Sequence, residues 1–150
     1  MAEFGYNEVQ TIQPGEAAIL EDVRPCTRRP RLVIHDNMTP NIILRGIVNN
    51  PCCGNAQYNV SFSGNIALAE GATVGEIQMA LSVNGYTRPL TIGAATPAAV
   101  GDYWHVSGDT TLDVPVGCCT TVTVVNASTG TTTAPAIDVR NLNVRVTRIA

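Results

Sequence analysis

The sequence predicts an all-β domain in which two antiparallel sheets, together about eight to ten short strands, stack on each other. Apolar and polar residues alternate over many short segments, and clusters of Gly, Pro, Asn, Asp and Thr separate these segments. No stretch of about ten residues repeats its apolar side chains with the 3.6-residue period of a helix. These patterns favour a sandwich, a jelly roll or a closed barrel, and alternation alone does not choose among the three.

The length of 150 residues predicts one domain spanning residues 1–150, since this is near the usual size of a single domain. Part of residues 1–48 is expected to serve as an N-terminal docking arm. The first residues lack a basic segment followed by an apolar one, and no apolar run reaches the roughly 18 residues that cross a bilayer. We therefore expect a protein made in the cytoplasm without a signal peptide, and without a membrane partner.

The clearest strand covers residues 77–83, where Ile77, Met79 and Leu81 alternate with polar or small residues. It runs into Asn84-Gly85, which is the strongest short signal for a hairpin turn, and the chain should return over residues 86–92. The other predicted strands are residues 9–13, 17–21, 31–35, 41–48, 57–62, 65–69, 103–107, 110–114, 120–126 and 142–149. Helix should be nearly absent.

The last predicted strand, residues 142–149, also alternates between apolar and polar residues. Val144 and Val146 share one face with Leu142, whereas Arg145 points to the other face. In a sandwich this pattern predicts an inner strand, which would tie the end of the chain into a sheet.

The composition predicts a subunit whose surface is largely covered by contacts. Only 14% of the residues are charged, where an ordinary domain has about 25%. All nine basic residues are arginine, which is enriched where proteins meet, whereas lysine favours open surface. A genome that favours arginine codons would explain the missing lysine equally well, but not the low total charge. The net charge of -3 argues against a nucleic-acid partner.

The order of segments resembles a known family. The segments that carry the likeness are residues 57–62, 75–85, 96–100, 114–124 and 139–150, with residues 4–10 and 44–47 near the start. Together they resemble the TNF-like or C1q-like jelly-roll modules of structural proteins from bacteriophages and prophages of Gram-positive gut bacteria. The resemblance spans nearly the whole chain, but it consists of strand and turn patterns rather than a catalytic signature.

The resemblance implies a two-sheet antiparallel jelly roll that assembles as a homotrimer around a threefold axis. It implies a non-enzymatic virion protein on the capsid exterior, either a capsid decoration (cement) protein or a head fibre, bound to the major capsid protein. The alternative is a receptor- or carbohydrate-binding tip of a phage fibre, with a host-surface glycan as its ligand. The chain is poor in aromatic residues, so the aromatic trimer core of the vertebrate branch does not carry over.

Four arginines form the one basic patch of the chain, and flanking prolines should hold it extended. They are the predicted capsid-docking residues: Arg24, Arg28, Arg29 and Arg31. Bidentate pairs with carboxylates of an acidic capsid lattice would suit them. The alternative is a solvated loop that Glu21, Asp22 and Asp36 balance, and both interpretations stay open at this point.

The only dense aromatic cluster is Tyr103-Trp104-His105, in which Trp104 should face away from its two neighbours. One side could line a subunit contact or stack on a sugar ring, although core packing is the commonest role of a single tryptophan. We predict Tyr103, Trp104, Val144 and Val146 as subunit-contact residues.

The five cysteines are Cys26 and the adjacent pairs Cys52-Cys53 and Cys118-Cys119. None has the C-x-x-C spacing that grips zinc, so no metal or other cofactor is predicted. The favoured interpretation is buried free thiols in a reducing cytosol, with cross-links between the two pairs left open.

The sequence predicts no enzyme. His105 lies near Asp102 and Asp109, but alternation along one strand places Asp102 and His105 on opposite faces. A carboxylate pair for glycoside hydrolysis could be assembled from Asp109 and Asp113, as in any chain with twelve acidic residues.

Overall fold

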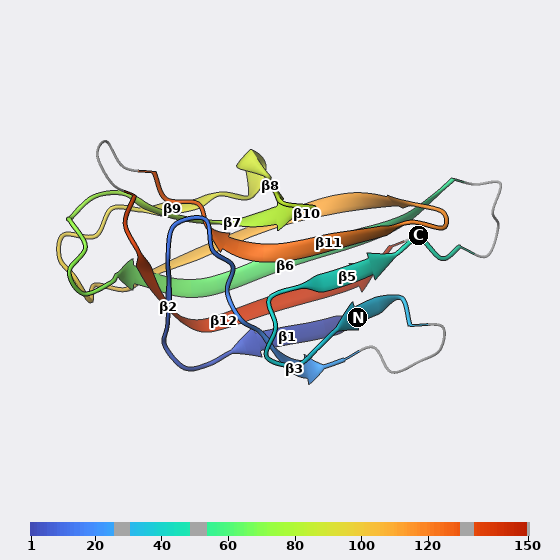
Figure 1. The fold of residues 1–150 in the computed structure, drawn as a ribbon, viewed down its shortest axis with the longest axis horizontal. Helices are drawn as coiled ribbons and strands as arrows, with labels where there is room; N and C mark the ends of the chain where they lie inside the picture. The colour runs from blue at the N-terminus through green and yellow to red at the C-terminus, as the bar shows by residue number, and fades with distance from the viewer. Residues whose placement is uncertain (26–30, 49–53, 130–133, 150) are drawn as a thin grey trace.

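The structure is a computed structural model, and it describes residues 1–25, 31–48, 54–129 and 134–149. Two six-stranded antiparallel sheets lie face to face (Figure 1). Sheet A contains, in order, β10 (Trp104–Pro115), β6 (Asn55–Leu68), β12 (Ile137–Arg148), β1 (Ala2–Tyr6) and β3 (Glu21–Arg24), and β2 (Gln10–Ile12) also pairs with β12. Sheet B contains β4 (Val33–His35), β5 (Ile42–Arg45), β11 (Cys119–Asn126), β7 (Ile77–Val83) and β8 (Tyr86–Thr87), and β9 (Gly93–Ala95) also pairs with β7.

The predicted all-β class and two-sheet architecture are confirmed. In the described part of the chain, the only helical segment is the 3-10 turn η2 (Pro89–Thr91). No helix in these ranges is long and apolar enough to cross a membrane.

The core lies between the sheets and follows the predicted alternation. On β6, Tyr58, Val60 and Phe62 point inward and are buried, and Leu81 and Val124 meet them from sheet B. Each fully buried side chain of this kind stabilises the fold by roughly 1.5–3 kcal/mol.

Val144 and Val146 are fully buried in this core, so their predicted role as subunit contacts is wrong. The physical reason is the position of β12, which lies between β6 and β1. Its apolar face therefore packs on the opposite sheet of the same chain. The prediction of residues 142–149 as an inner strand is confirmed by the same pairing.

Two long strands replace four predicted short ones. β6 joins the segments predicted at 57–62 and 65–69, and β10 joins those predicted at 103–107 and 110–114. Gly64 and Gly108 interrupt the apolar alternation, but both lie within the continuous pairing of β6 with β10. At Gly108 an added Cβ would lie 2.3 Å from the backbone oxygen of Thr91. This glycine therefore marks a close approach of two backbone segments rather than a turn.

The N-terminal region forms part of the sandwich. Residues 1–25 and 31–48, where we expected a partial docking arm, supply β1 to β5 and so contribute to both sheets. Phe4 and Leu20 are buried in the core. Any docking role of this region therefore belongs to exposed side chains on a fixed scaffold.

The predicted hairpin is present. Asn84 and Gly85 have positive φ angles of 51° and 86°, as the turn requires. The returning strand β8 is shorter than predicted and stops at Thr87, because Pro89 has no N–H to donate to the ladder.

Candidate functional site

The predicted docking arginines are only partly visible, because Arg28 and Arg29 lie outside the described residues. Arg24 stands at the end of the edge strand β3, and its Nε lies 3.9 Å from Oε2 of Glu3. Arg31 is exposed, and its carbonyl oxygen accepts a hydrogen bond of 3.2 Å from Nη1 of Arg45. Arg24 is thus balanced by Glu3 of a neighbouring strand rather than by the acids close to it in sequence.

The aromatic cluster does not pack into the core. Trp104 is 49% exposed, and its Nε1 donates a hydrogen bond of 3.2 Å to Oδ2 of Asp102. The guanidinium of Arg140 lies over the ring of Tyr103, 3.9 Å from the ring centre. His105 makes its 3.3 Å contact with Asn65. The structure therefore joins Asp102 to Trp104 and does not join it to His105.

An apolar side of the sandwich was missed by sequence reasoning. β8 and β10 are the outermost strands of their sheets on the same side (Figure 1). The turn η2 follows β8 in the chain and packs against β10. Here Leu90 is 99% exposed, Tyr86 is 80% exposed and Ile92 is 38% exposed. We call these three residues the apolar side. The sequence signal was Pro89, which ends the returning strand and releases the following residues from the sheet.

The inward anchor of η2 explains why Leu90 points outward. Thr91 is buried, and its Oγ1 accepts a hydrogen bond of 3.0 Å from Leu81 N and donates one of 2.7 Å to Arg88 O. Gly108 lets this turn approach β10 closely. The neighbouring Leu90 is therefore held away from the core.

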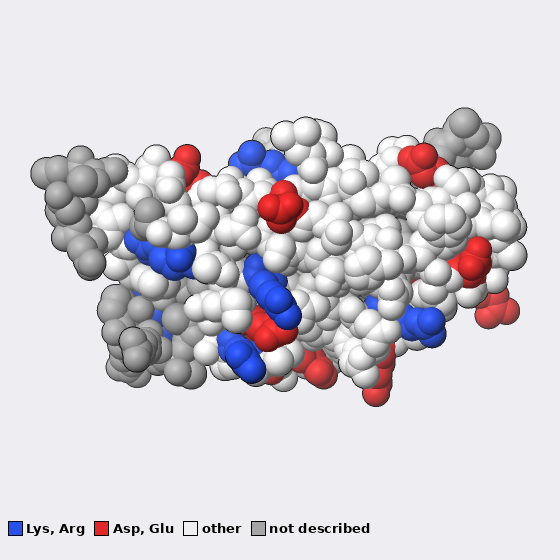
Figure 2. Space-filling view, turned by 180° about the vertical axis from the view of Figure 1, so that it is seen from behind, with Lys and Arg blue, Asp and Glu red and all other residues white. Residues whose placement is uncertain are grey.

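The outer face of sheet A carries a shallow hollow of about 750 Å³. Its polar lining comes from three adjacent strands, β10, β6 and β12, and Phe62, Leu90 and Gly108 complete it. The polar residues are Asn59, Ser61, Ser63, Ser107, Asp109, Asn143 and Arg145. Figure 2 shows this face, on which separate acidic and basic groups stand among uncharged atoms. We call this feature the polar hollow.

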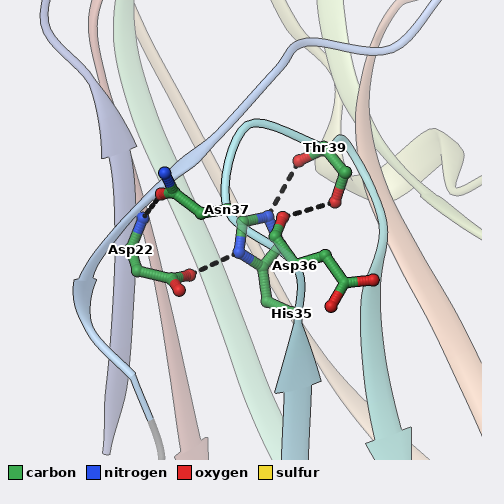
Figure 3. Close-up of polar contacts among 5 residues, drawn as sticks. All are labelled: Asp22, His35, Asp36, Asn37 and Thr39. Carbon is green, nitrogen blue, oxygen red and sulfur yellow. Dashed lines mark hydrogen bonds and ion pairs between the residues drawn. The ribbon is translucent and has the colours of Figure 1, made fainter.

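A buried histidine joins the two sheets at the opposite side of the sandwich (Figure 3). Nδ1 of His35, at the end of β4, lies 2.5 Å from Oδ1 of Asp22 on β3, and its Nε2 lies 2.8 Å from the carbonyl oxygen of Thr39. The ring is 1% exposed and packs against Phe4 of β1, with ring centres 4.7 Å apart. Asn37 adds a hydrogen bond of 2.9 Å from Asp22 N to its Oδ1.

Both ring nitrogens of His35 thus face an oxygen that can accept a hydrogen bond. Asp22 and His35 together need two protons to make both contacts, one on Nε2 and one between Nδ1 and the carboxylate. Because β3 belongs to sheet A and β4 to sheet B, the pair closes this side of the sandwich. No local pattern in the sequence indicates this pair, since the two residues lie in different sheets. The arrangement is structural, because the ring has no exposed face for a ligand.

The visible cysteines differ from the predicted buried thiols. Cys118 and Cys119 are free and exposed at the turn between β10 and β11. They are exposed because β11 begins there and its first buried residue is Thr120. Cys26, Cys52 and Cys53 lie outside the described residues. Within those ranges, no three His, Cys, Asp or Glu side chains gather closely enough to hold a metal ion.

Comparison with solved structures shows what the sandwich is similar to. Eiger TNF from S. frugiperda superimposes with a TM-score of 0.66 at 10% identity, covering 99% of this chain and 91% of that one. The globular domain of zebrafish complement 1qA superimposes with a TM-score of 0.54 at 12% identity, covering 97% and 96%. The fold is a jelly roll of the TNF and C1q type.

Other comparisons add little to this jelly roll. The C-terminal domain of EclA, a sugar-binding protein, matches with a TM-score of 0.44 at 12% identity over 93% of this chain and 78% of that one, a superposition too loose to define a shared fold. No protein-family model matches the sequence, and no curated protein matches it.

Proposed function

We propose that the chain is a non-enzymatic structural subunit that forms a homotrimer on the outer surface of a bacteriophage head. In this role it acts as a capsid decoration (cement) protein or a head fibre and binds the major capsid protein. The observation that carries the proposal is the apolar side, above all Leu90, which is 99% exposed. The sequence resemblance to phage jelly-roll modules supports the viral setting.

The apolar side favours assembly because large apolar residues that gather in one place lose contact with water when a partner covers them. Burial of Leu90, Tyr86 and Ile92 would contribute roughly 1.5–3 kcal/mol for each side chain that becomes fully covered. In a ring of three copies each contact is heterologous, so this side binds a different surface of the next copy. The low charged fraction of 14% is consistent with a surface that contacts cover in part.

Arg24 and Arg31 suit the contact with the capsid. Both are exposed, and they border the segment that holds the other two arginines of the basic patch. The carboxylate of Glu3, which lies near Arg24, also contacts Arg145 at 3.7 Å from Nε, so it is shared between two arginines. An acidic capsid surface could therefore pair with Arg24 at little desolvation cost.

Light scattering tests the assembly. The wild-type chain should give three times 15.8 kDa at micromolar concentration. Leu90→Ser should shift the mass toward the monomer, whereas Val74→Ser, which changes an exposed apolar residue outside the apolar side, should not. A monomeric wild type would refute the trimer. Cosedimentation with empty phage heads tests the capsid role, and Arg24→Ser should weaken it.

The second candidate function is the receptor- or carbohydrate-binding tip of a phage fibre. The exposure of Trp104 favours it, since an indole ring outside the core can stack on a sugar. This candidate predicts that purified protein binds saccharide or bacterial cell wall and that Trp104→Ala removes the binding. Binding to empty heads without saccharide binding would favour decoration instead.

A further inference from the structure

The polar hollow on sheet A is lined mostly by short polar side chains, which is unusual both for a contact between copies and for a fully solvated sheet face. Long charged side chains usually cover an exposed sheet face, but the middle strand β6 presents Asn59, Ser61 and Ser63 here. Because these side chains are short and the flanking strands carry Asp109 and Arg145, the face is hollowed along β6. A contact between copies of the chain would normally centre on apolar residues, which this floor lacks.

Cross-strand register places complementary groups on the two sides of the hollow. Ser61 pairs with Asp109 of β10 on one side and with Arg145 of β12 on the other. Neighbouring strands lie about 4.8 Å apart, so the two charged residues stand roughly 10 Å apart across Ser61. In the next row, Ser63 pairs with Ser107 and Asn143 in the same way. Two rows of donors and acceptors thus line one recess.

The polar groups of the hollow are available to a ligand. The carboxylate of Asp109 forms no hydrogen bond or ion pair with the described residues, and Asp109 is exposed. Arg145 contacts Glu3 through Nε at 3.7 Å and remains 58% exposed. The row of Asp109, Ser61 and Arg145 therefore contains one unpaired carboxylate and one guanidinium whose charge Glu3 offsets in part. A neutral ligand therefore fits this row better than an anion or a cation.

From these observations we infer that the polar hollow binds one ring of a neutral saccharide. Sugar hydroxyls both donate and accept, so one can donate to Asp109 while a neighbour accepts from Arg145 or Asn143. Leu90 lines the same hollow and is exposed, so it offers an apolar contact for the C–H face of the ring. The volume of about 750 Å³ lies in the range of small-molecule sites. The inference rests on the second candidate function and moves its ligand from Trp104, at the start of β10, to the polar hollow.

Backbone amide NMR with four defined probes tests the inference: glucose, galactose, mannose and N-acetylglucosamine. At least one probe should shift the amide signals of Ser61, Ser63 and Ser107 saturably, with a Kd of about 1 mM. The matched variants are Asp109→Ala and Asp113→Ala. Asp113 is an exposed acid on the same strand and face but outside the hollow. Asp109→Ala should weaken binding about tenfold or more, and Asp113→Ala should leave it unchanged.

The outcomes separate this inference from the functions proposed above. Saturable binding that Asp109→Ala weakens and Trp104→Ala spares supports the polar hollow. Binding that Trp104→Ala removes and Asp109→Ala spares keeps the fibre-tip function and refutes the hollow. No saturable shift with any probe at about 50 mM, well above a millimolar Kd, refutes the hollow, whereas the fibre-tip function is refuted only if the protein also fails to bind bacterial cell wall. If Asp109→Ala lowers the mass of the assembly in light scattering while it stays folded by circular dichroism, the hollow is a contact between copies and the inference is wrong.

Discussion

Replacement of His35 by leucine should destabilise the sandwich far more than the same replacement of His105, the only other histidine. In the wild type, His35 lies 2.5 Å from the Asp22 carboxylate and 2.8 Å from the carbonyl oxygen of Thr39, and its ring is 1% exposed. A hydrogen bond to a charged group contributes about 1.5–3 kcal/mol, and one to a neutral carbonyl about 1 kcal/mol. Leucine retains most of the apolar contact with Phe4 but makes neither bond.

The expected loss for His35→Leu is therefore roughly 2.5–4 kcal/mol in the free energy of unfolding. Asp22→Ala removes one of the two contacts and should cost roughly 1.5–3 kcal/mol. His105→Leu changes an exposed ring whose contact with Asn65 is 3.3 Å long, so it should stay within about 0.5 kcal/mol.

Urea denaturation followed by far-UV circular dichroism measures all three variants. The double variant His35→Leu with Asp22→Ala should cost clearly less than the sum of the single losses, because both single changes break the same contact. If His35→Leu cost less than about 1 kcal/mol, or if the two single losses were additive, the pair would not join the sheets as argued.

Three further predictions concern separate parts of the fold. Gly108→Ala places a Cβ 2.3 Å from the Thr91 backbone oxygen, so η2 must move, and thermal unfolding should show a loss of more than about 1 kcal/mol. Val144→Ala removes buried methyl groups from the central strand β12 and should cost about 2 kcal/mol by urea denaturation, without changing the mass of the assembly. Cys118→Ser and Cys119→Ser should each remove one thiol from the number that reacts with Ellman's reagent in the native protein, since both side chains are exposed.

Sequence patterns predicted the parts of the fold that depend on local alternation and turn chemistry. The Ile77, Met79 and Leu81 pattern with Asn84-Gly85 correctly placed a strand and its turn, because each signal acts within a few residues. The break predicted between residues 107 and 110 was wrong, because a glycine required for the approach of a distant segment, here Gly108, has the same appearance in a sequence as one required for a turn.

The candidate surfaces were harder to predict because they depend on pairing between distant strands. Val144 alternates with polar neighbours, and this pattern is the same whether the apolar face of the strand packs in the core or on another subunit. The sequence therefore could not show that Val144 is a core residue. Asp109 and Arg145 are brought into one row only by the register of β6 with two strands from later in the chain. Asp22 and His35 meet because their edge strands lie on the same side of two different sheets.

Leu90 connects the proposed assembly with the proposed saccharide site, and this shared role has a consequence for mutational experiments. The residue belongs to the apolar side and also lines the polar hollow, because the buried Thr91 anchors η2 across β10. Leu90→Ser should therefore weaken both self-association and saccharide binding. This variant by itself cannot distinguish the assembly surface from the saccharide site. Tyr86 belongs only to the apolar side, and Asp109 lines only the hollow. Tyr86→Ser should lower the mass of the assembly and leave saccharide binding unchanged. Asp109→Ala should weaken saccharide binding and leave the mass of the assembly unchanged. If the two variants had the same effect, the two surfaces would form one continuous contact.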